Sequence, residues 1–245
     1  MKITILTLFP TMYDGFLNTS IIKRIIDKGI AEIKVVDIRD YSLDKHRHVD
    51  DTPYGGGAGM LMKVDVVDRA LVDNSSTNAH VILTSPKGKK LKQEDLIRLS
   101  KLDDIVIICG HYEGLDARIE DHCNELISIG DYILTGGELA SMVISDGILR
   151  LLDDSISKES LKEESFDNNL LEYDQYTRPY DYKGNKVPDV LVNGNHKDIE
   201  HYKLKSSLKQ TIIHRPDLLK NRSFTAEEIK ILEEIKQDLA NNSHK

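Results

Sequence analysis

The sequence has only two cysteines among its 245 residues, and Cys109 and Cys123 form no C-x-x-C pair. This argues against a disulfide framework or a zinc site and favours a reducing, cytoplasmic environment. No run of about 18 apolar residues occurs, so no membrane span is expected. The first ten residues, MKITILTLFP, lack the long apolar core and the cleavage site of a signal peptide, and they are predicted to begin a buried strand.

The common nucleotide-binding and hydrolytic motifs are missing as well. There is no P-loop of the form G-x-x-x-x-G-K-S/T, and the glycines at Gly57 and Gly59 are not followed by the third glycine of a Rossmann motif. The motifs H-E-x-x-H and G-x-S-x-G and the protein-kinase set are absent too. These absences disfavour the familiar nucleotide-binding folds.

The overall charge is acidic, with a formal net charge of −8, while hydrophobic residues make up 40% and charged residues 30% of the chain. This composition is typical of a folded protein and argues against non-specific coating of nucleic acid. Residues 196–222 are locally basic, with seven Lys or Arg against three Asp or Glu. They are interpreted either as a solvated helix face, which composition alone favours, or as a surface that contacts phosphate.

Five short runs rich in Val and Ile predict buried strands, and their continuous rather than alternating apolar character is typical of a parallel sheet covered on both faces. They span residues 3–9, 32–38, 81–85, 105–109 and 125–129. Apolar residues at helical spacing lie between them, around residues 21–26, 64–71, 91–102 and 139–152. The alternation of strand and helix predicts an α/β fold.

The chain changes character after this region. Residues 153–174 are polar and acidic and are predicted to form a flexible linker. Helical spacing returns at residues 199–212, and a capping box from Thr225 to Glu228 predicts a last helix. The predicted organisation is therefore an α/β domain at 1–152, a linker at 153–174 and a small helical domain at 175–245.

Glycine recurs where three predicted strands end, in SPKG, CGHYEG and IGDYILTGGELA. In an open parallel sheet, ligands bind outside the carboxyl ends of the strands. Each of these segments alone is interpreted as an ordinary turn, but the three together predict a ligand site. A further segment, DDTPYGGGAGML at 50–61, places four glycines within five positions, so backbone there is expected to approach another group closely.

A set of motifs in matching order resembles bacterial tRNA (guanine-N1)-methyltransferases of the SPOUT superfamily. The motifs are TLFPTM (7–12), DDTPYGGGAGMLM (50–62), SPKGKKL (85–91), CGHYEGLDARI (109–119), SIGDYILTGGELA (128–140), QYTRP (175–179) and NGNHKDI (193–199). The resemblance implies a knotted parallel sheet flanked by helices, with a small helical C-terminal domain. It also implies a homodimer that uses S-adenosylmethionine to methylate N1 of guanosine 37 in tRNA. A SPOUT enzyme with another RNA target, or a non-catalytic tRNA-binding relative, is the alternative.

The resemblance also implies which residues hold the cofactor, mostly through backbone groups and apolar contacts. Glu113 is expected beside the cofactor or the target base, where a magnesium ion is also allowed; the alternative is a loop carboxylate that accepts a backbone N–H. The cofactor-binding residues expected in this way are Leu83, Thr84, Ser85, Pro86, Gly110, Glu113, Ser128, Ile129, Gly130, Asp131, Tyr132, Ile133, Leu134, Gly136 and Gly137.

Methylation of guanine N1 sets its own chemical demands. The nitrogen carries a proton at neutral pH, so a base must remove it, and a cation should stabilise the charge that develops at O6. By resemblance the cation is Arg150 and the base is Glu164, which stands where relatives have an aspartate. Asp167 is the alternative base, and a merely solvated acidic linker is the alternative interpretation of both.

The same resemblance favours tRNA contact for the basic segment and places the glycine-rich loop at the subunit interface, around a target guanine that has left its stack. Lys220 and Arg222 belong to the basic segment. The residues expected to contact tRNA or the target base are Asp50, Tyr54, Gly55, Gly56, Gly57, Gly59, Ser165, His196, Lys205, Lys209 and Arg215.

Overall fold

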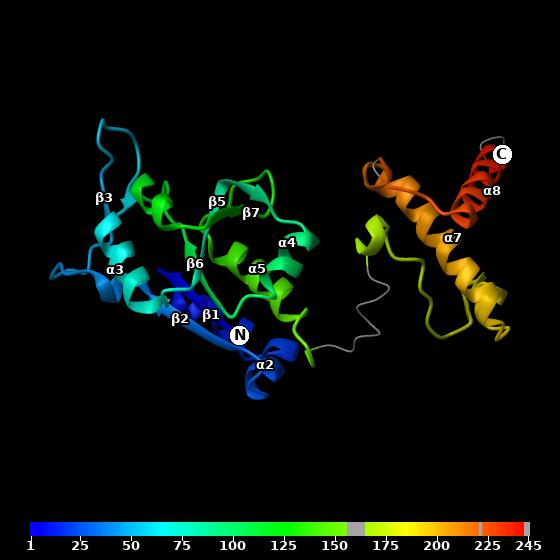
Figure 1. Ribbon diagram of the computed structural model, residues 1–245, viewed down its shortest axis with the longest axis horizontal. Helices are drawn as coiled ribbons and strands as arrows, with labels where there is room; N and C mark the ends of the chain where they lie inside the picture. The colour runs from blue at the N-terminus through cyan, green and yellow to red at the C-terminus, as the bar shows by residue number, and fades with distance from the viewer. Residues whose placement is uncertain (156–164, 221, 243–245) are drawn as a thin grey trace. The chain divides into compact units, whose positions relative to one another are not determined.

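The computed structural model describes residues 1–155, 165–220 and 222–242, and the chain divides into two compact units, Met1–Ser157 and Lys158–Lys245 (Figure 1). Each unit has a hydrophobic core of its own. Glu164, the expected base, lies outside the described residues.

The N-terminal unit is built on a five-stranded parallel sheet with the strand order β2-β1-β6-β5-β7. All five predicted strands are present, and the α/β prediction is confirmed; the knot stays a prediction. The strands are β1 (Lys2–Thr7), β2 (Glu32–Asp37), β5 (His80–Lys90), β6 (Asp104–Cys109) and β7 (Glu125–Ser128).

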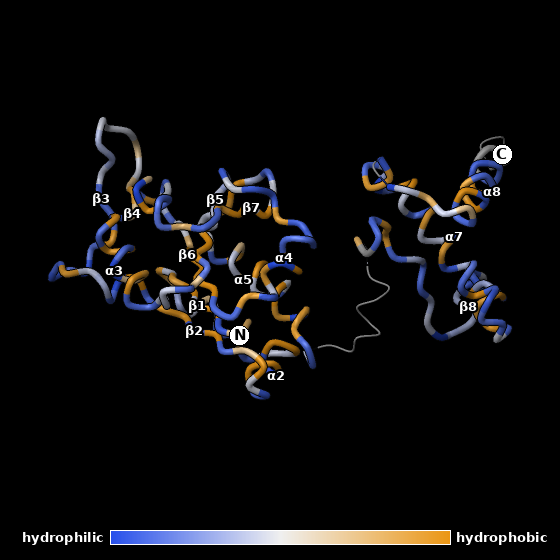
Figure 2. Tube along the Cα trace, in the orientation of Figure 1, coloured by the Kyte–Doolittle hydropathy of each residue, from blue (hydrophilic) through white to orange (hydrophobic). Residues whose placement is uncertain are grey.

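Both faces of the sheet are buried, which explains the continuous apolar runs. Along β6, Ile105 and Ile107 belong to one core cluster, while Val106 and Ile108 belong to the cluster on the other face. The first cluster is covered by α2 (Ser20–Asp27), α4 (Gln93–Leu99) and α5 (Glu138–Leu149), and the second by α3 (Val64–Asn74) and the 3₁₀-helix η3 (Ala117–His122). Figure 2 shows hydrophobic segments gathered at the sheet and hydrophilic segments in the outer loops.

Short elements complete this unit. Near the N-terminus they are η1 (Pro10–Tyr13) and α1 (Asp14–Leu17), and η2 (Ile38–Tyr41) follows β2. The strands β3 (Asp50–Asp51) and β4 (Leu61–Met62) pair in antiparallel fashion and frame the glycine-rich loop, which we define as residues 52–60. Figure 1 shows this loop reaching outward from the sheet.

The C-terminal unit packs two helices, α7 (His196–His214) and α8 (Ala226–Asn242), around Leu208, Ile231 and Ile235. The predicted capping box is confirmed, because Glu228 N donates to Thr225 Oγ1 and Thr225 N donates to a Glu228 carboxylate oxygen at 2.8 Å. The shorter elements are η4 (Asp167–Asn169), β8 (Asp181–Tyr182), β9 (Asn185–Lys186), η5 (Asp189–Leu191) and η6 (Pro216–Leu219).

The end of the predicted linker lies against α7. Leu170 is buried in the helical core, and Leu171 N donates to Thr211 Oγ1 at 2.8 Å. The Asp174 carboxylate accepts hydrogen bonds from Gln210 Nε2 at 2.9 Å and from Ser206 Oγ at 3.2 Å. Residues 170–174 therefore belong with the C-terminal helices, and the domain boundaries at 152 and 174 stay predictions.

Of the helices in the described part of the chain, none is both long enough and apolar enough to cross a bilayer.

Candidate active site

A cavity of about 540 Å³ lies where β5, β6 and β7 reach the same edge of the sheet. Most of its lining comes from three segments, 83–87, 110–115 and 127–137, and Glu120 and Ala140 complete it. These are the segments in which glycine recurs after strands, and the parallel sheet brings them together because parallel strands end at one edge. Every residue expected to bind the cofactor lines this cavity except Asp131, whose carboxylate pairs with Lys90.

The first wall is a loop that leaves β5 in the middle of the strand. Thr84 and Lys89 both lie opposite Ile127 of β7, so residues 85–88 project out of the ladder. Ser85, Pro86 and Lys87 line the cavity from this position. The sequence predicted a strand that ends at 85, whereas the structure continues β5 to Lys90 beyond the projecting loop.

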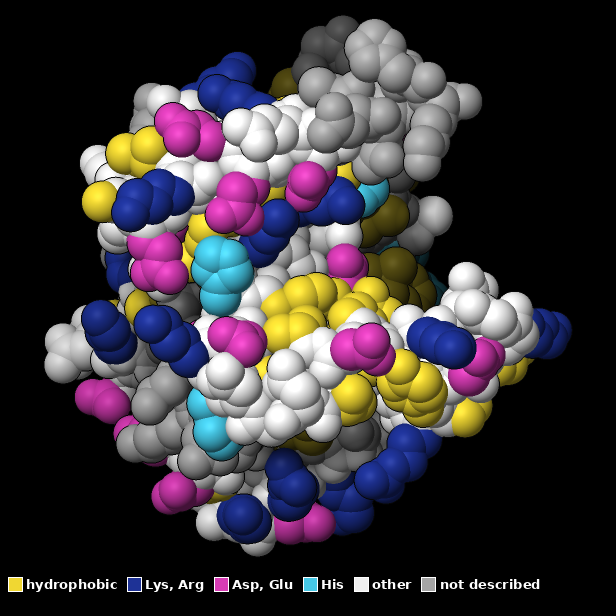
Figure 3. Space-filling model, turned by 90° about the vertical axis from the view of Figure 1, so that its right-hand side faces the viewer, with side chains coloured by type: hydrophobic (Ala, Val, Ile, Leu, Met, Phe, Trp, Pro, Cys, Tyr) yellow, Lys and Arg dark blue, Asp and Glu magenta, His cyan; other side chains and the backbone are white. Residues whose placement is uncertain are grey.

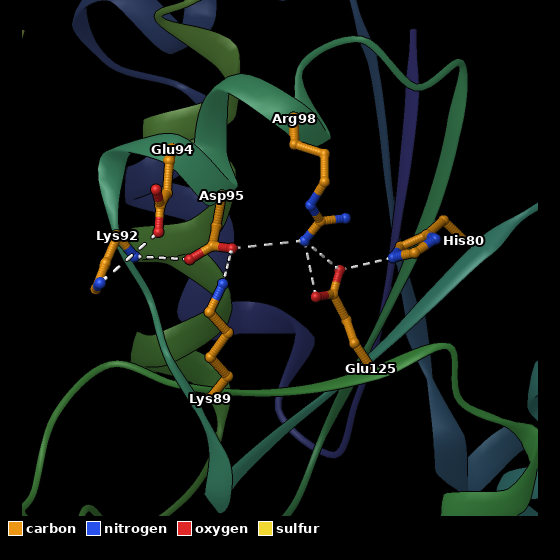
Figure 4. A network of polar contacts seen from close by, with 7 residues as sticks. All are labelled: His80, Lys89, Lys92, Glu94, Asp95, Arg98 and Glu125. Carbon is orange, nitrogen blue, oxygen red and sulfur yellow. Dashed lines mark hydrogen bonds and ion pairs between the residues drawn. The ribbon is translucent and has the colours of Figure 1, made fainter.

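A polar network holds the strand segment that follows this loop (Figure 4). Lys89 Nζ lies 2.7 Å from Asp95 Oδ1 on α4, and Lys92 N donates to Asp95 Oδ2 at 3.1 Å. Burial opposes the ionisation of Asp95, but the hydrogen bonds from Lys89 and Lys92 outweigh it and hold its pKa below the usual range. Arg98 connects the same helix to Glu125 of β7 at 2.8 Å. The network therefore ties α4 to both strands beside the cavity.

The second wall, residues 110–115, and the third wall, residues 127–137, contact each other through their backbones. Gly137 N donates to Gly110 O at 2.7 Å, which joins the end of β6 to the start of α5. A Cβ atom on Gly137 would lie 2.1 Å from Thr84 Oγ1 and 2.9 Å from the Gly110 nitrogen. Only glycine fits here, so the glycines of the third wall serve close packing around the cavity.

A layer of polar side chains lies buried beside the second and third walls. Glu138, the first residue of α5, is almost fully buried, and its Oε1 accepts a hydrogen bond from Thr7 Oγ1 at 2.8 Å. Its Oε2 lies 3.9 Å from Nδ1 of His111, which lines the cavity. The sequence analysis did not identify Thr7 or Glu138 as site residues. The only sequence signal for their burial is that each polar residue lies inside or directly beside an apolar run.

The same layer contains a tyrosine and a thiol. The Tyr13 hydroxyl lies 2.6 Å from Ser141 Oγ and 3.4 Å from Cys109 Sγ. Burial raises the pKa of Tyr13 and raises the pKa of the Cys109 thiol to about 12. Both groups therefore stay protonated at neutral pH, and they hold the end of β6 against α5 rather than supply a reactive anion.

Glu113 connects the cavity to the glycine-rich loop. It lines the cavity, and its N–H donates to Met60 O at 3.1 Å. Its side chain lies against Gly59, where a Cβ atom would be only 2.2 Å from Glu113 Cγ. One end of the glycine-rich loop is therefore joined to the second wall of the cavity.

The rest of the glycine-rich loop is open. Tyr54 is fully exposed, and a Cβ atom on Gly55 or Gly56 would meet nothing within 4 Å. Gly57 would touch only Pro53, at 3.9 Å, and Asp50 lies half-buried in β3. Within this loop, Gly59 is the glycine that packs against a cavity-lining side chain, that of Glu113.

The expected catalytic groups are only partly described. Arg150 follows α5 directly, is half-buried, and its backbone N–H donates to Asp146 O at 3.1 Å. Asp167 lies in η4 of the C-terminal unit, where Ser165 Oγ accepts from Glu172 N at 3.0 Å. Among the described residues no group of three or more His, Cys, Asp or Glu is arranged to hold a metal ion.

Two of the basic candidates on the C-terminal unit, Lys205 and Arg215, have acidic partners. Lys205 Nζ lies 3.0 Å from Glu234 and 3.1 Å from Asp238, and Arg215 pairs with Asp217 at 2.7 Å. Figure 3 shows Lys and Arg side chains close to Asp and Glu side chains over much of the face that it draws. Lys209 and His196 are exposed, and in the described part of the chain no ion pair involves Lys209. A count of charges in the sequence did not reveal this pairing.

The sequence of the chain matches one family of known proteins. Residues 1–221 match the family described as tRNA (Guanine-1)-methyltransferase TrmD. A protein of Fusobacterium nucleatum subsp. nucleatum named tRNA (guanine-N(1)-)-methyltransferase is 52% identical over 97% of this chain and 99% of its own length. Proteins of the same name from Dictyoglomus turgidum and Macrococcus caseolyticus are 47% and 50% identical, over 98% and 97% of this chain and 98% and 100% of their own lengths. The chain therefore belongs to the tRNA (guanine-1)-methyltransferase family.

Proposed function

We propose that the cavity at the edge of β5, β6 and β7 is the place where this enzyme transfers a methyl group from S-adenosylmethionine to N1 of guanosine 37 in tRNA. The observation that carries the proposal is the convergence of three glycine-containing walls on one cavity, in a chain that belongs to this family.

The cavity suits the cofactor in size and chemistry. Its volume of about 540 Å³ falls within the range of about 300–1,000 Å³ that is typical of small-molecule sites. Leu115, Ile129 and Ile133 supply apolar contact for a purine, and the glycine walls expose backbone groups for ribose and adenine. Glu113 supplies a carboxylate for the positively charged methionine portion. When bound, S-adenosylmethionine supplies an electrophilic methyl group on a cationic sulfur.

The chain's own residues then act on the guanine. Glu164 is the proposed base for the N1 proton, with Asp167 as the alternative, and both belong to the predicted linker at 153–174. Arg150 is proposed to stabilise the negative charge that develops at O6 in the transition state. A magnesium ion at Glu113 stays a prediction, and no step of this proposal requires it.

The third wall and α5 support the proposal of a homodimer. Leu139 and Val143 lie one turn apart on α5 and are 50% and 49% exposed, and Ile133 in the preceding loop is 80% exposed. Large apolar side chains exposed on one helix and in the loop before it are typical of a surface that a partner covers. A second copy of the chain is the proposed partner, and sedimentation equilibrium would detect a monomer if this is wrong.

Methyl transfer with labelled S-adenosylmethionine tests the proposed function directly. The purified chain is incubated with an unmodified tRNA transcript, and primer extension maps the modified nucleotide. We expect a stop at guanosine 37, and no stop in a matched transcript that carries adenosine there. Lack of transfer, or transfer that survives the change of nucleotide 37, would contradict the proposal; a stop elsewhere would indicate another RNA target.

A further inference from the structure

A continuous stretch of the C-terminal unit is exposed although it is rich in aromatic residues. All residues from 175 to 186 are exposed, and we call them the tyrosine segment; they precede α7 in Figure 1. Tyr176, Tyr180 and Tyr182 are 49%, 42% and 60% exposed. Tyrosine rings usually bury most of their surface, so three exposed rings in twelve residues indicate a surface that awaits a partner.

Two of these rings are held in place by their hydroxyl groups. The Tyr180 hydroxyl donates to Asp189 Oδ1 at 2.6 Å, and Tyr176 shares a side-chain hydrogen bond with Tyr202 of α7. The hydroxyl end of each ring is anchored while much of the ring stays in solvent. An aromatic platform that is already oriented loses little conformational entropy when a flat group stacks on it.

The third ring is carried by a tight hairpin. β8 and β9 are joined by Lys183 and Gly184, which both have positive φ values, 54° and 86°. The turn is closed because Gly184 N donates to Asp181 Oδ1 at 2.9 Å. Lys183 Nζ lies 5.3 Å from the centre of the Tyr182 ring. The hairpin thus presents an aromatic ring and an ammonium group side by side.

The positive charges of the tyrosine segment outnumber its negative charges. Arg178, Lys183 and Lys186 stand against a single acidic residue, Asp181. Within the described ranges none of these three cations has an ion-pair partner, whereas Lys205 and Arg215 do. An uncommitted cation can contact phosphate without first breaking an internal pair.

We propose that the tyrosine segment binds unpaired nucleotides of the tRNA, with bases stacked on the tyrosine rings and phosphates beside Arg178, Lys183 and Lys186. Exposed aromatics interleaved with cations are the combination by which proteins hold single-stranded nucleic acid. The inference rests on the proposed function for the identity of the RNA. It assigns RNA contact to a segment that the basic stretch 196–222 does not include.

Binding of fluorescent, unmodified tRNA to the full-length protein tests the proposal. Replacing Tyr182 by alanine removes one stacking ring, so we expect affinity to fall about fivefold or more. The matched control is Tyr182→Phe, which keeps the ring and should bind like the wild type. The double variant K183Q/K186Q should reduce the slope of log affinity against log salt by about 1.4, because two cations no longer neutralise phosphates. The variant Lys205→Gln, which removes a paired cation, should change the slope less.

Failure of the tyrosine segment to bind tRNA can be distinguished from failure of the proposed function. If the wild type does not methylate tRNA, the proposed function fails. If the wild type methylates and binds tRNA, but Tyr182→Ala and K183Q/K186Q bind as tightly and with the same salt slope, only the tyrosine segment is wrongly assigned. Circular dichroism of each variant checks that the unit is folded. Calorimetric binding of S-adenosylmethionine should be unchanged in all of them, because these residues lie outside the cavity lining.

Discussion

The contact between Gly59 and Glu113 allows the proposed cofactor site to be perturbed through a residue that has no side chain. In Gly59→Ala, the new Cβ would lie 2.2 Å from Glu113 Cγ and 2.9 Å from its Cδ and Oε1, distances that real Cβ atoms essentially never show. The nearest atom is Cγ of Glu113, which cannot move away by rotation of the terminal carboxylate alone. Glu113 must therefore change its χ1 rotamer and carry its carboxylate away from its present place at the cavity.

The size of the effect follows from what the carboxylate does. A hydrogen bond to a charged group contributes about 1.5–3 kcal/mol. If Glu113 binds the cationic portion of S-adenosylmethionine, its displacement should lower kcat/KM for the cofactor about 10- to 100-fold. Calorimetry with S-adenosylmethionine alone should show a comparable loss of affinity.

A matched control separates this effect from backbone strain. Gly55 lies in the same loop with nearly the same φ, +87° against +89° for Gly59, but its Cβ would meet nothing within 4 Å. Gly55→Ala therefore carries the conformational cost without the collision. The double variant G59A/E113A should bind the cofactor no worse than Glu113→Ala. Equal losses in Gly59→Ala and Gly55→Ala would refute the reasoning.

Three further predictions concern other parts of the chain. Arg150→Ala should lower kcat strongly but leave calorimetric cofactor affinity nearly intact, because its proposed contact forms in the transition state; collapse of cofactor affinity would contradict that role. Burial raises the pKa of Cys109 to about 12 and of Cys123 to about 11. Both thiols should therefore react slowly with a disulfide reagent at neutral pH until urea unfolds the protein. Fast labelling of the native protein would contradict the described packing of the two thiols. The hydrogen bonds from Arg222 hold the pKa of Glu228 below its usual range. The pair therefore stabilises the fold fully above the pKa of an unfolded glutamate, about 4.3. This contribution is lost as the pH falls through the lower pKa of Glu228 in the folded protein. Glu228→Gln should therefore weaken the fall of the melting temperature as the pH drops below about 4.3, and an unchanged fall would show that the pair contributes nothing.

The regular elements could be predicted because their signals are local. A strand buried on both faces appears as a continuous apolar run, and the run at 105–109 needs no partner to be identified. The capping box at Thr225 is equally local, since both hydrogen bonds join residues three positions apart. The three walls of the cavity could be placed at one edge once the sheet was taken as parallel.

The remaining features depend on partners that are distant in sequence. Glu138 lies within an apolar stretch. Nothing local indicates that its buried carboxylate accepts a hydrogen bond from the hydroxyl of Thr7, 131 positions away. Lys205 appeared to be an open cation because Glu234 and Asp238 belong to another helix. The closeness of Gly59 to Glu113 likewise requires the pairing of β4 with the loop after β6. Local patterns give the elements, but the neighbours of each polar side chain come only from the assembled fold.

The projecting loop of β5 constrains how the protein can tolerate changes in chain length. Because Thr84 and Lys89 both face Ile127, the number of residues between them is set by the ladder on either side. If a deletion in the loop shifted the following strand segment by one residue, Lys89 would turn to the opposite face of the sheet and lose its contact with Asp95. At the tip of the glycine-rich loop, a Cβ atom on Gly55 or Gly56 would meet nothing within 4 Å, and no ladder fixes the number of residues there. A reporter peptide could therefore be inserted at that tip without unfolding the unit, whereas in the β5 loop even a Cβ atom on Gly88 would lie 2.5 Å from the Ile127 nitrogen.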